Sequence, residues 1–245
     1  LNLSNENGVT AFMMACNNGR TDVVKLLLDH SDPKIELNAR DDCNFTAFMA
    51  ACHNGHKEVI QLLLDHSERI ELNARTHLGS TAFMLACSNG HKDVVKLLLD
   101  HSGSNIDLNA RTYDDDIIDE LIPAVLDGWT AFMMACYEGH KDVVKLLLDH
   151  SDPKIDLNVR NNEGMTALMW ACFEGHKDVV QLLLDHSERI DLNARNTGWT
   201  AFTMACLFKR KDVVKLLLEY PEIIDINVPE SFPLSQDIKD LIEFH

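Results

Sequence analysis

The chain has 245 residues, 46% of them hydrophobic and 25% charged, which is the composition of a soluble globular protein. No apolar run approaches the roughly 20 residues of a membrane-spanning helix, and the opening LNLSNENG lacks the basic and apolar segments of a secretion signal. The net charge of −17 argues against nucleic acid and anionic membranes as partners, because both need a basic surface.

One pattern returns six times along the chain: Thr-Ala, then Phe or Leu, two variable residues, and Ala-Cys. The copies begin at Thr10, Thr46, Thr81, Thr130, Thr166 and Thr200. Each continues through a Gly-containing turn, a Val-Val-x-Leu-Leu-Leu segment, a loop and an Asn-containing end, although the sixth copy lacks the glycine. Recurrence at such a period is typical of repeat proteins, in which each unit buries its apolar face against its neighbours.

Each copy predicts two helices followed by a polar hairpin. In the first copy, Thr10 is an expected N-cap for a helix over 11–17, because its hydroxyl can accept a backbone N–H. Gly19 then fits a left-handed helix end. The second helix is predicted over 21–30, where the Val and Leu stripe is too broad for a helix with a free face. We therefore expect neighbouring copies to cover both of its sides.

The pattern resembles the ankyrin repeat, T-P-L-H-x-A-A-x-x-G-H-x-x-V-V-x-L-L-L, over essentially residues 1–228. This resemblance implies an all-α repeat solenoid of helix-turn-helix units and β-hairpin loops, with six copies and a C-terminal capping helix. It also implies a partner protein held on the concave face. The chain departs from the family pattern in carrying Ala for Pro, Met or Thr203 for His, and Cys for the second Ala.

We predict a single domain over 1–245. Its repeats lie near 5–38, 41–73, 76–109, 127–158, 161–193 and 196–227, with an insertion at 112–127 and a C-terminal cap at 229–245. Copies 4 to 6 match copies 1 to 3 at an offset of about 120 residues, which indicates a duplicated three-copy block.

The two ends of the array differ in sequence. The segment SQDIKDLIEFH has one apolar and one polar face, and predicts a single capping helix near 235–244. Copy 1 keeps the complete apolar set of an internal copy, so we expect further repeats to precede it and cover that face.

The repeated cysteines and histidines could in principle form disulfides or bind metal, but we interpret them as structural residues. Stacked helices lie about 8–10 Å apart, so cysteines at equivalent positions are too distant for disulfides and histidines too distant for a shared metal. The cysteines predicted to be buried in the core are Cys16, Cys52, Cys87, Cys136, Cys172 and Cys206. Cys43 is predicted at a hairpin tip, where it is either a surface thiol without a chemical role or a reactive thiol. Since no catalytic, phosphate-binding or metalloprotease motif is present, we expect no enzyme activity, no cofactor and no metal.

The copies differ most at the residue before each repeated Thr and at the two residues after each repeated Cys, and we expect the binding surface at these positions. Copies 1 to 3 are polar at the latter positions, whereas copies 4 to 6 are aromatic, as is usual for interface anchors. The predicted partner-binding residues are Phe45, His53, His77, Trp129, Tyr137, Met165, Phe173, Trp199, Leu207 and Phe208. The alternative is that these rings pack against adjacent repeats.

The insertion and the basic run of copy 6 each allow two interpretations. The insertion carries the apolar residues Ile117, Ile118, Leu121 and Ile122, which either belong to a tolerated loop or contact the array or a partner. Copy 6 replaces Gly-His with Lys209-Arg210, which starts a basic run that either is solvated or meets an acidic group of the partner.

The leading hypothesis is a monomeric, intracellular scaffold or adaptor, in a reducing compartment such as the cytoplasm, that binds one partner protein. The alternative is a substrate-recognition module of a larger enzyme or of a ubiquitin-ligase-type assembly.

Overall fold

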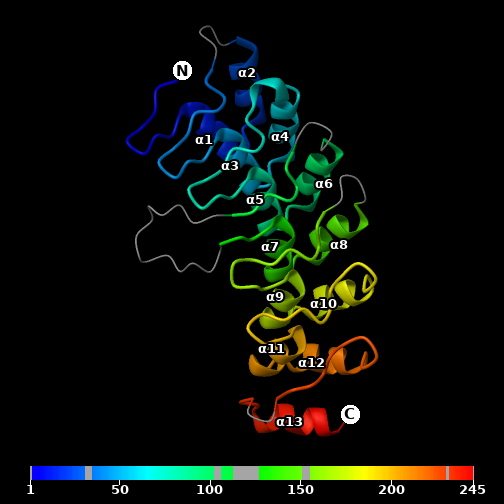
Figure 1. Ribbon diagram of the computed structural model, residues 1–245. Coiled ribbons are helices and arrows are strands. Elements are labelled where there is room, and N and C mark those ends of the chain that lie inside the picture. Colours follow the sequence, from blue (N-terminus) through cyan, green and yellow to red (C-terminus); the bar gives the residue numbers. More distant parts are fainter. Residues whose placement is uncertain are drawn as a thin grey trace. The chain divides into compact units, whose positions relative to one another are not determined.

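A computed structural model describes residues 2–30, 35–101, 106–112, 127–150, 155–229 and 232–244, and within these ranges the named elements are all helices (Figure 1). The chain divides into two compact units, Leu1–Asp127 and Gly128–His245. Each unit holds three copies of the repeat, so the division falls where the sequence predicts that the second block begins.

Every copy forms the expected pair of helices. The first unit contains α1 (Ala11–Asn17), α2 (Thr21–His30), α3 (Ala47–His53), α4 (Lys57–Leu64), the 3₁₀ turn η1 (Ser67–Arg69), α5 (Ala82–Ser88) and α6 (Lys92–Asp100). The second contains α7 (Ala131–Tyr137), α8 (Lys141–Asp149), α9 (Ala167–Glu174), α10 (Lys177–Leu184), α11 (Ala201–Leu207), α12 (Lys211–Leu218) and α13 (Gln236–Glu243). Within each unit the first helices of the copies pack in one row and the second helices in another (Figure 1).

The threonine that opens each copy is an N-cap, as predicted. The hydroxyl of Thr46, for example, accepts a hydrogen bond of 3.3 Å from the backbone N–H of Met49. The same bond forms at Thr10, Thr81, Thr130, Thr166 and Thr200. It satisfies one of the orphan donors at the start of a helix, and so fixes where each first helix begins.

The repeated glycine has two roles, of which only the first was predicted. Gly55 adopts a left-handed φ of 74°, which ends its helix. A Cβ added there would also lie 2.6 Å from Nδ1 of His91 in the next copy. That histidine ring lies with Nε2 2.8 Å from the carbonyl oxygen of His53, at the end of α3. The missing side chain therefore leaves room for a histidine that binds one copy to the next. The same contact joins Gly19 to His56 and Gly139 to His176.

Copy 6 modifies this arrangement. Arg210 stands where copies 2 to 5 have histidine. It lies against Gly175, and its Nε–H donates to the carbonyl oxygen of Phe173 at 2.7 Å. Lys209 occupies the glycine position and keeps a left-handed φ of 56°, which is strained for a residue with a side chain.

The six repeated cysteines are free and buried, as predicted, and Cys43 is exposed. Burial raises the pKa of the Cys16 and Cys206 thiols to about 12 and raises those of the other four further, so these thiols stay protonated near neutral pH. The core also contains the phenylalanine or leucine of each Thr-Ala-Phe/Leu segment and most of the valines and leucines of the second helices.

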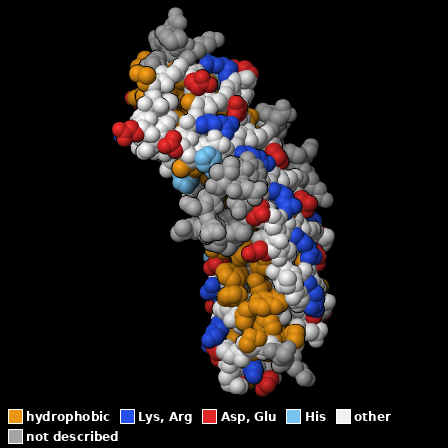
Figure 2. Space-filling model, turned by 60° about the vertical axis from the view of Figure 1, so that its left-hand side comes forward, with side chains coloured by type: hydrophobic (Ala, Val, Ile, Leu, Met, Phe, Trp, Pro, Cys, Tyr) orange, Lys and Arg blue, Asp and Glu red, His pale blue; other side chains and the backbone are white. Residues whose placement is uncertain are grey.

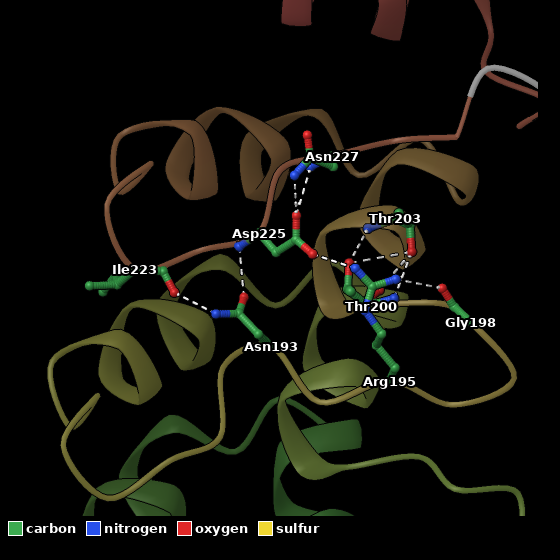
Figure 3. A network of polar contacts seen from close by, with 8 residues as sticks. All are labelled: Asn193, Arg195, Gly198, Thr200, Thr203, Ile223, Asp225 and Asn227. Atoms are coloured by element: carbon green, nitrogen blue, oxygen red, sulfur yellow. Dashed lines mark hydrogen bonds and ion pairs between the residues drawn. The ribbon is translucent and has the colours of Figure 1, made fainter.

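The loops between copies turn back as hairpins closed by a few backbone hydrogen bonds, such as Thr76 N–H to Ser80 O at 3.0 Å and Gly79 N–H to Thr76 O at 2.9 Å, without forming named strands in the described residues. Asparagines link them to the following copy. Asn193 donates to the carbonyl oxygen of Ile223 at 2.9 Å and accepts from the N–H of Asp225 at 2.7 Å (Figure 3). Arg195 pairs with the Asp225 carboxylate and donates to the Gly198 carbonyl oxygen (Figure 3).

The ends of the array differ as the sequence suggests. In copy 1, Met14, Val23 and Leu26 are 54%, 40% and 58% exposed, whereas the corresponding residues of copies 2 and 3 are buried or half-buried. At the other end, α13 packs on α12, buries Ile238 completely and forms an ion pair of 2.7 Å between Lys211 and Asp237. The predicted capping helix is thus confirmed.

Candidate protein-binding surface

Five aromatic rings of the second unit form a continuous group, which we call the aromatic cluster: Trp129, Tyr137, Trp170, Phe173 and Phe208. The Trp129 and Trp170 ring centroids lie 4.6 Å apart, and Tyr137 meets both indoles edge-on at 5.2 and 5.6 Å. Trp170 in turn contacts Phe173 at 5.5 Å, and Phe173 contacts Phe208 at 4.2 Å. Because consecutive copies supply consecutive rings, the cluster runs across copies 4, 5 and 6.

The cluster has a buried floor and an accessible edge. Trp129 is 1% and Trp170 5% exposed, so the two indoles form the floor. Tyr137, Phe173 and the neighbouring Leu207 are half-buried, and Phe208 is 38% exposed. Figure 2 shows hydrophobic side chains gathered on this face of the second unit.

The first helices of the copies position the accessible side chains. Tyr137 and Leu207 are the last residues of α7 and α11, and Phe173 is the residue before the last of α9. The threonine caps fix the start of each helix, and the residues after the cysteines therefore emerge at equivalent places in successive copies.

Charges border the cluster. Burial raises the pKa of the Tyr137 hydroxyl, and the carboxylates of Glu174 and Glu138 raise it further. A hydrogen bond to Glu174 acts in the same direction. Glu174 also faces the Arg210 guanidinium at 3.6 Å. Tyr137 is thus held by a group of the next copy while Glu138 is exposed to solvent.

The family model for ankyrin repeats (three copies) matches overlapping windows of the chain at residues 1–75, 33–112, 69–161, 108–196 and 153–230. The chain belongs to the ankyrin repeat family. No curated protein shows a significant match to the chain. Ankyrin repeats are generally modules of protein–protein interaction, and the resemblance noted from the sequence is confirmed.

Two of the predicted binding residues do not reach the surface of the ankyrin array. Trp129 is 1% exposed and Met165 only 2%, so the prediction that they present side chains to a partner is wrong. Trp129 lies against Trp170 of the next repeat, and the Met165 sulfur accepts a hydrogen bond of 2.9 Å from Asn196. For these residues the alternative of packing against adjacent repeats holds.

Trp199 is half-buried and contacts Phe232, which lies between copy 6 and α13, at a centroid distance of 5.5 Å. It therefore lies outside the five-ring group.

The first three ankyrin repeats present a polar surface at the matching positions. Phe45 is half-buried and meets the His53 ring edge-on at 6.2 Å, and His53 Nδ1 lies 3.1 Å from the amide nitrogen of Asn89. His77 is exposed in the next hairpin, where its backbone N–H donates to the carbonyl oxygen of Cys43 at 3.3 Å.

Trp170 is the main residue that the sequence interpretation missed. In the other copies its position carries Met14, Ala50, Leu85, Met134 or Met204, and no role was predicted for it from the sequence. Its size was the available signal, since it is the one tryptophan at that position. Its Nε1 is buried without a hydrogen-bond partner among the described residues.

The two remaining segments have different outcomes. Ile117, Ile118, Leu121 and Ile122 lie outside the described residues. The basic run of copy 6 is engaged within the chain, since Arg210 binds Phe173 and Glu174 while Lys211 pairs with Asp237. Within the described ranges, three or more His, Cys, Asp or Glu side chains nowhere gather as a metal site would need, and no helix is long and apolar enough to cross a membrane.

Proposed function

We propose that the chain is an interaction scaffold that binds a partner protein through the aromatic cluster of the second unit. The supporting observation is that half-buried Tyr137, Phe173 and Leu207, with exposed Phe208, lie in sequence over a floor of two buried indoles. Aromatic anchors on a packed floor are the usual features of binding hot spots, because they bury a large area at a small cost in side-chain entropy. The excess of acidic residues favours a partner with basic groups at its contact rim.

The chain itself supplies a matched control for this proposal. Copies 1 to 3 carry Asn17, His53, Ser88 and Asn89 where copies 4 to 6 carry Tyr137, Phe173, Leu207 and Phe208. The exchange variant Tyr137→Asn/Phe173→His/Leu207→Ser/Phe208→Asn therefore introduces residues that the same fold already accommodates. It removes the accessible apolar edge and leaves the indole floor in place.

The test is quantitative affinity capture from a lysate of the source cells with the wild type beside the exchange variant. We expect proteins that the wild type retains to be depleted on the variant by about ten-fold or more, which corresponds to about 1.4 kcal/mol of binding free energy. Circular dichroism checks that both are folded. An identical set of captured proteins on both would contradict the proposal.

A further inference from the structure

The accessible side chains of the aromatic cluster form a row with a regular step. Tyr137, Phe173 and Leu207 occupy the same position in copies 4, 5 and 6, and all three are half-buried. The first helices that carry them pack side by side, which places equivalent positions about 8–10 Å apart. The centroids of Tyr137 and Phe173 both lie close to Trp170, at 5.6 and 5.5 Å from it, distances that allow such a step.

The floor of the cluster beside Tyr137 and Phe173 is more deeply buried than these two side chains. Trp170 separates Tyr137 from Phe173 but exposes only 5% of its surface. Phe208 contacts Phe173 at 4.2 Å and widens the row at the copy 6 end. A partner therefore meets apolar contacts at Tyr137, at Phe173, and at Leu207 with Phe208, and the two buried indoles form the recessed part of this surface.

Different backbone conformations meet such a row with different spacings. A β-strand places side chains on one face about every 6.6–6.8 Å, and the third residue along points to the opposite face. An α-helix needs seven residues, about 10.5 Å, to return to the same face, and its intervening i+3 and i+4 side chains fall over the recessed floor. A polyproline II helix has three residues per turn and a rise of about 3.1 Å, so every third side chain recurs after about 9.3 Å.

We infer that the aromatic cluster binds an extended partner segment in the polyproline II conformation with an apolar side chain at every third position, an inference that rests on the proposed function. The spacing is the first reason. The second is that proline-rich segments of this conformation dock on aromatic surfaces, because they are already ordered before binding and lose little entropy.

Charge assigns a direction to the segment. Exposed Glu138 follows Tyr137 at the copy 4 end, whereas exposed Lys209 follows Phe208 at the copy 6 end. A lysine or arginine of the partner therefore belongs beside Tyr137, and its acidic or neutral end belongs beside Phe208. Such rim charges select orientation and raise the association rate more than they raise affinity.

The experiment uses defined peptides rather than an unknown partner. A fluorescein-labelled peptide with lysine at one end and three consecutive Leu-Pro-Pro triplets is titrated with the full chain and followed by fluorescence anisotropy at physiological salt. One control peptide has the same composition with the leucines shuffled to spacings of two and four. A second is a helical peptide with leucine at every seventh position and the same lysine. Each is measured against the wild type and the exchange variant.

We expect the triplet peptide to bind the wild type about ten-fold or more tighter than either control, and to lose that advantage on the exchange variant. Equal affinity for the triplet and shuffled peptides would overturn the inference. Preferential binding of the helical peptide to the wild type would also overturn it, while leaving the aromatic cluster as the binding surface. If no peptide distinguishes the wild type from the exchange variant, the result counts against the cluster and thus against the proposed function itself.

Discussion

The two units of the chain share one repeat design and differ in what they present at the ends of their first helices. In the first unit these positions form a polar ladder, in which Asn54 donates to Asn17 at 3.0 Å and Asn89 lies 3.1 Å from His53. In the second unit the same positions hold the rings and the leucine of the aromatic edge. The caps, glycines and buried cysteines are common to both. The residues that follow each cysteine are therefore free to change the surface without changing the fold.

The largest expected effect tests what the two units share. Gly55→Ala in the first unit and Gly139→Ala in the second should each lower the free energy of unfolding by about 2–4 kcal/mol, because a left-handed alanine is strained and its Cβ meets a histidine ring. Both glycines have φ near 75°, and both Cβ positions lie 2.6 Å from a ring nitrogen. Urea denaturation followed by circular dichroism measures both.

Gly198→Ala is the matched control, since its φ is 99° and nothing lies within 4 Å of the added Cβ. It should lower the free energy of unfolding only by the strain of a left-handed alanine, about 1–2 kcal/mol. Equal losses at Gly139 and Gly198 would show that the histidine contact contributes nothing.

A smaller effect distinguishes the two surfaces. Phe173→His gives the second unit the residue that the first has at His53, and should lower the free energy of unfolding by about 1 kcal/mol through lost ring contacts. A double-mutant cycle with Phe208→Asn should give a coupling energy of about 0.5–1.5 kcal/mol. The control is His53→Asn, which removes an exposed ring whose contacts are the polar one with Asn89 and the edge-on one with Phe45. Strict additivity of the two substitutions in the cycle would mean that the rings are neighbours without interacting.

Copy 6 departs from the shared design at one residue, and repairing it should have a small favourable effect. Lys209→Gly relieves a left-handed backbone strain of about 1–2 kcal/mol, which stabilises the folded state. Glycine also raises the entropy of the unfolded chain, which offsets about 0.4–1 kcal/mol of this effect. The free energy of unfolding should therefore rise by about 0.5–1 kcal/mol. Lys209→Ala keeps the strain and should leave stability nearly unchanged. Thermal unfolding of the three proteins measures the difference, and a gain with alanine as large as with glycine would contradict the role of φ.

The smallest effect concerns the capping helix α13, which belongs to the second unit. Hydrogen bonds from Lys211 and Ser235 lower the pKa of the Asp237 carboxyl from its ordinary 3.8 to about 2. A depressed folded-state pKa stabilises the fold above about pH 4, and this contribution is lost as the pH falls toward 2. The difference in Tm between the wild type and Asp237→Asn should therefore shrink over that window. A constant difference from pH 5 to pH 2 would exclude the ionised carboxyl as its source.

The sequence predicts the framework of this protein well because the framework is periodic. Thr46 and Cys52 have counterparts in every other copy and Gly55 in all but copy 6, so repetition itself indicates cap, helix end and core. The burial of Trp129 and Met165 was missed because the position before each threonine is half-buried in the other copies. Trp129 is covered by Trp170 of the next copy, and Met165 contacts Asn196 of the next copy. Contacts between unlike residues of adjacent copies do not recur along the chain, so periodicity gives no information about them.

The contact between each glycine and the next copy's histidine also has a consequence for rearranging the chain. Whole copies can be deleted, inserted or recombined within a unit provided that a glycine always precedes a copy that begins its second helix with histidine. Lys209 breaks that rule, because its left-handed backbone is kept while the space for a ring is filled. A further histidine-bearing copy grafted directly behind copy 6 would clash at one residue, and a single codon change to glycine would make the junction compatible.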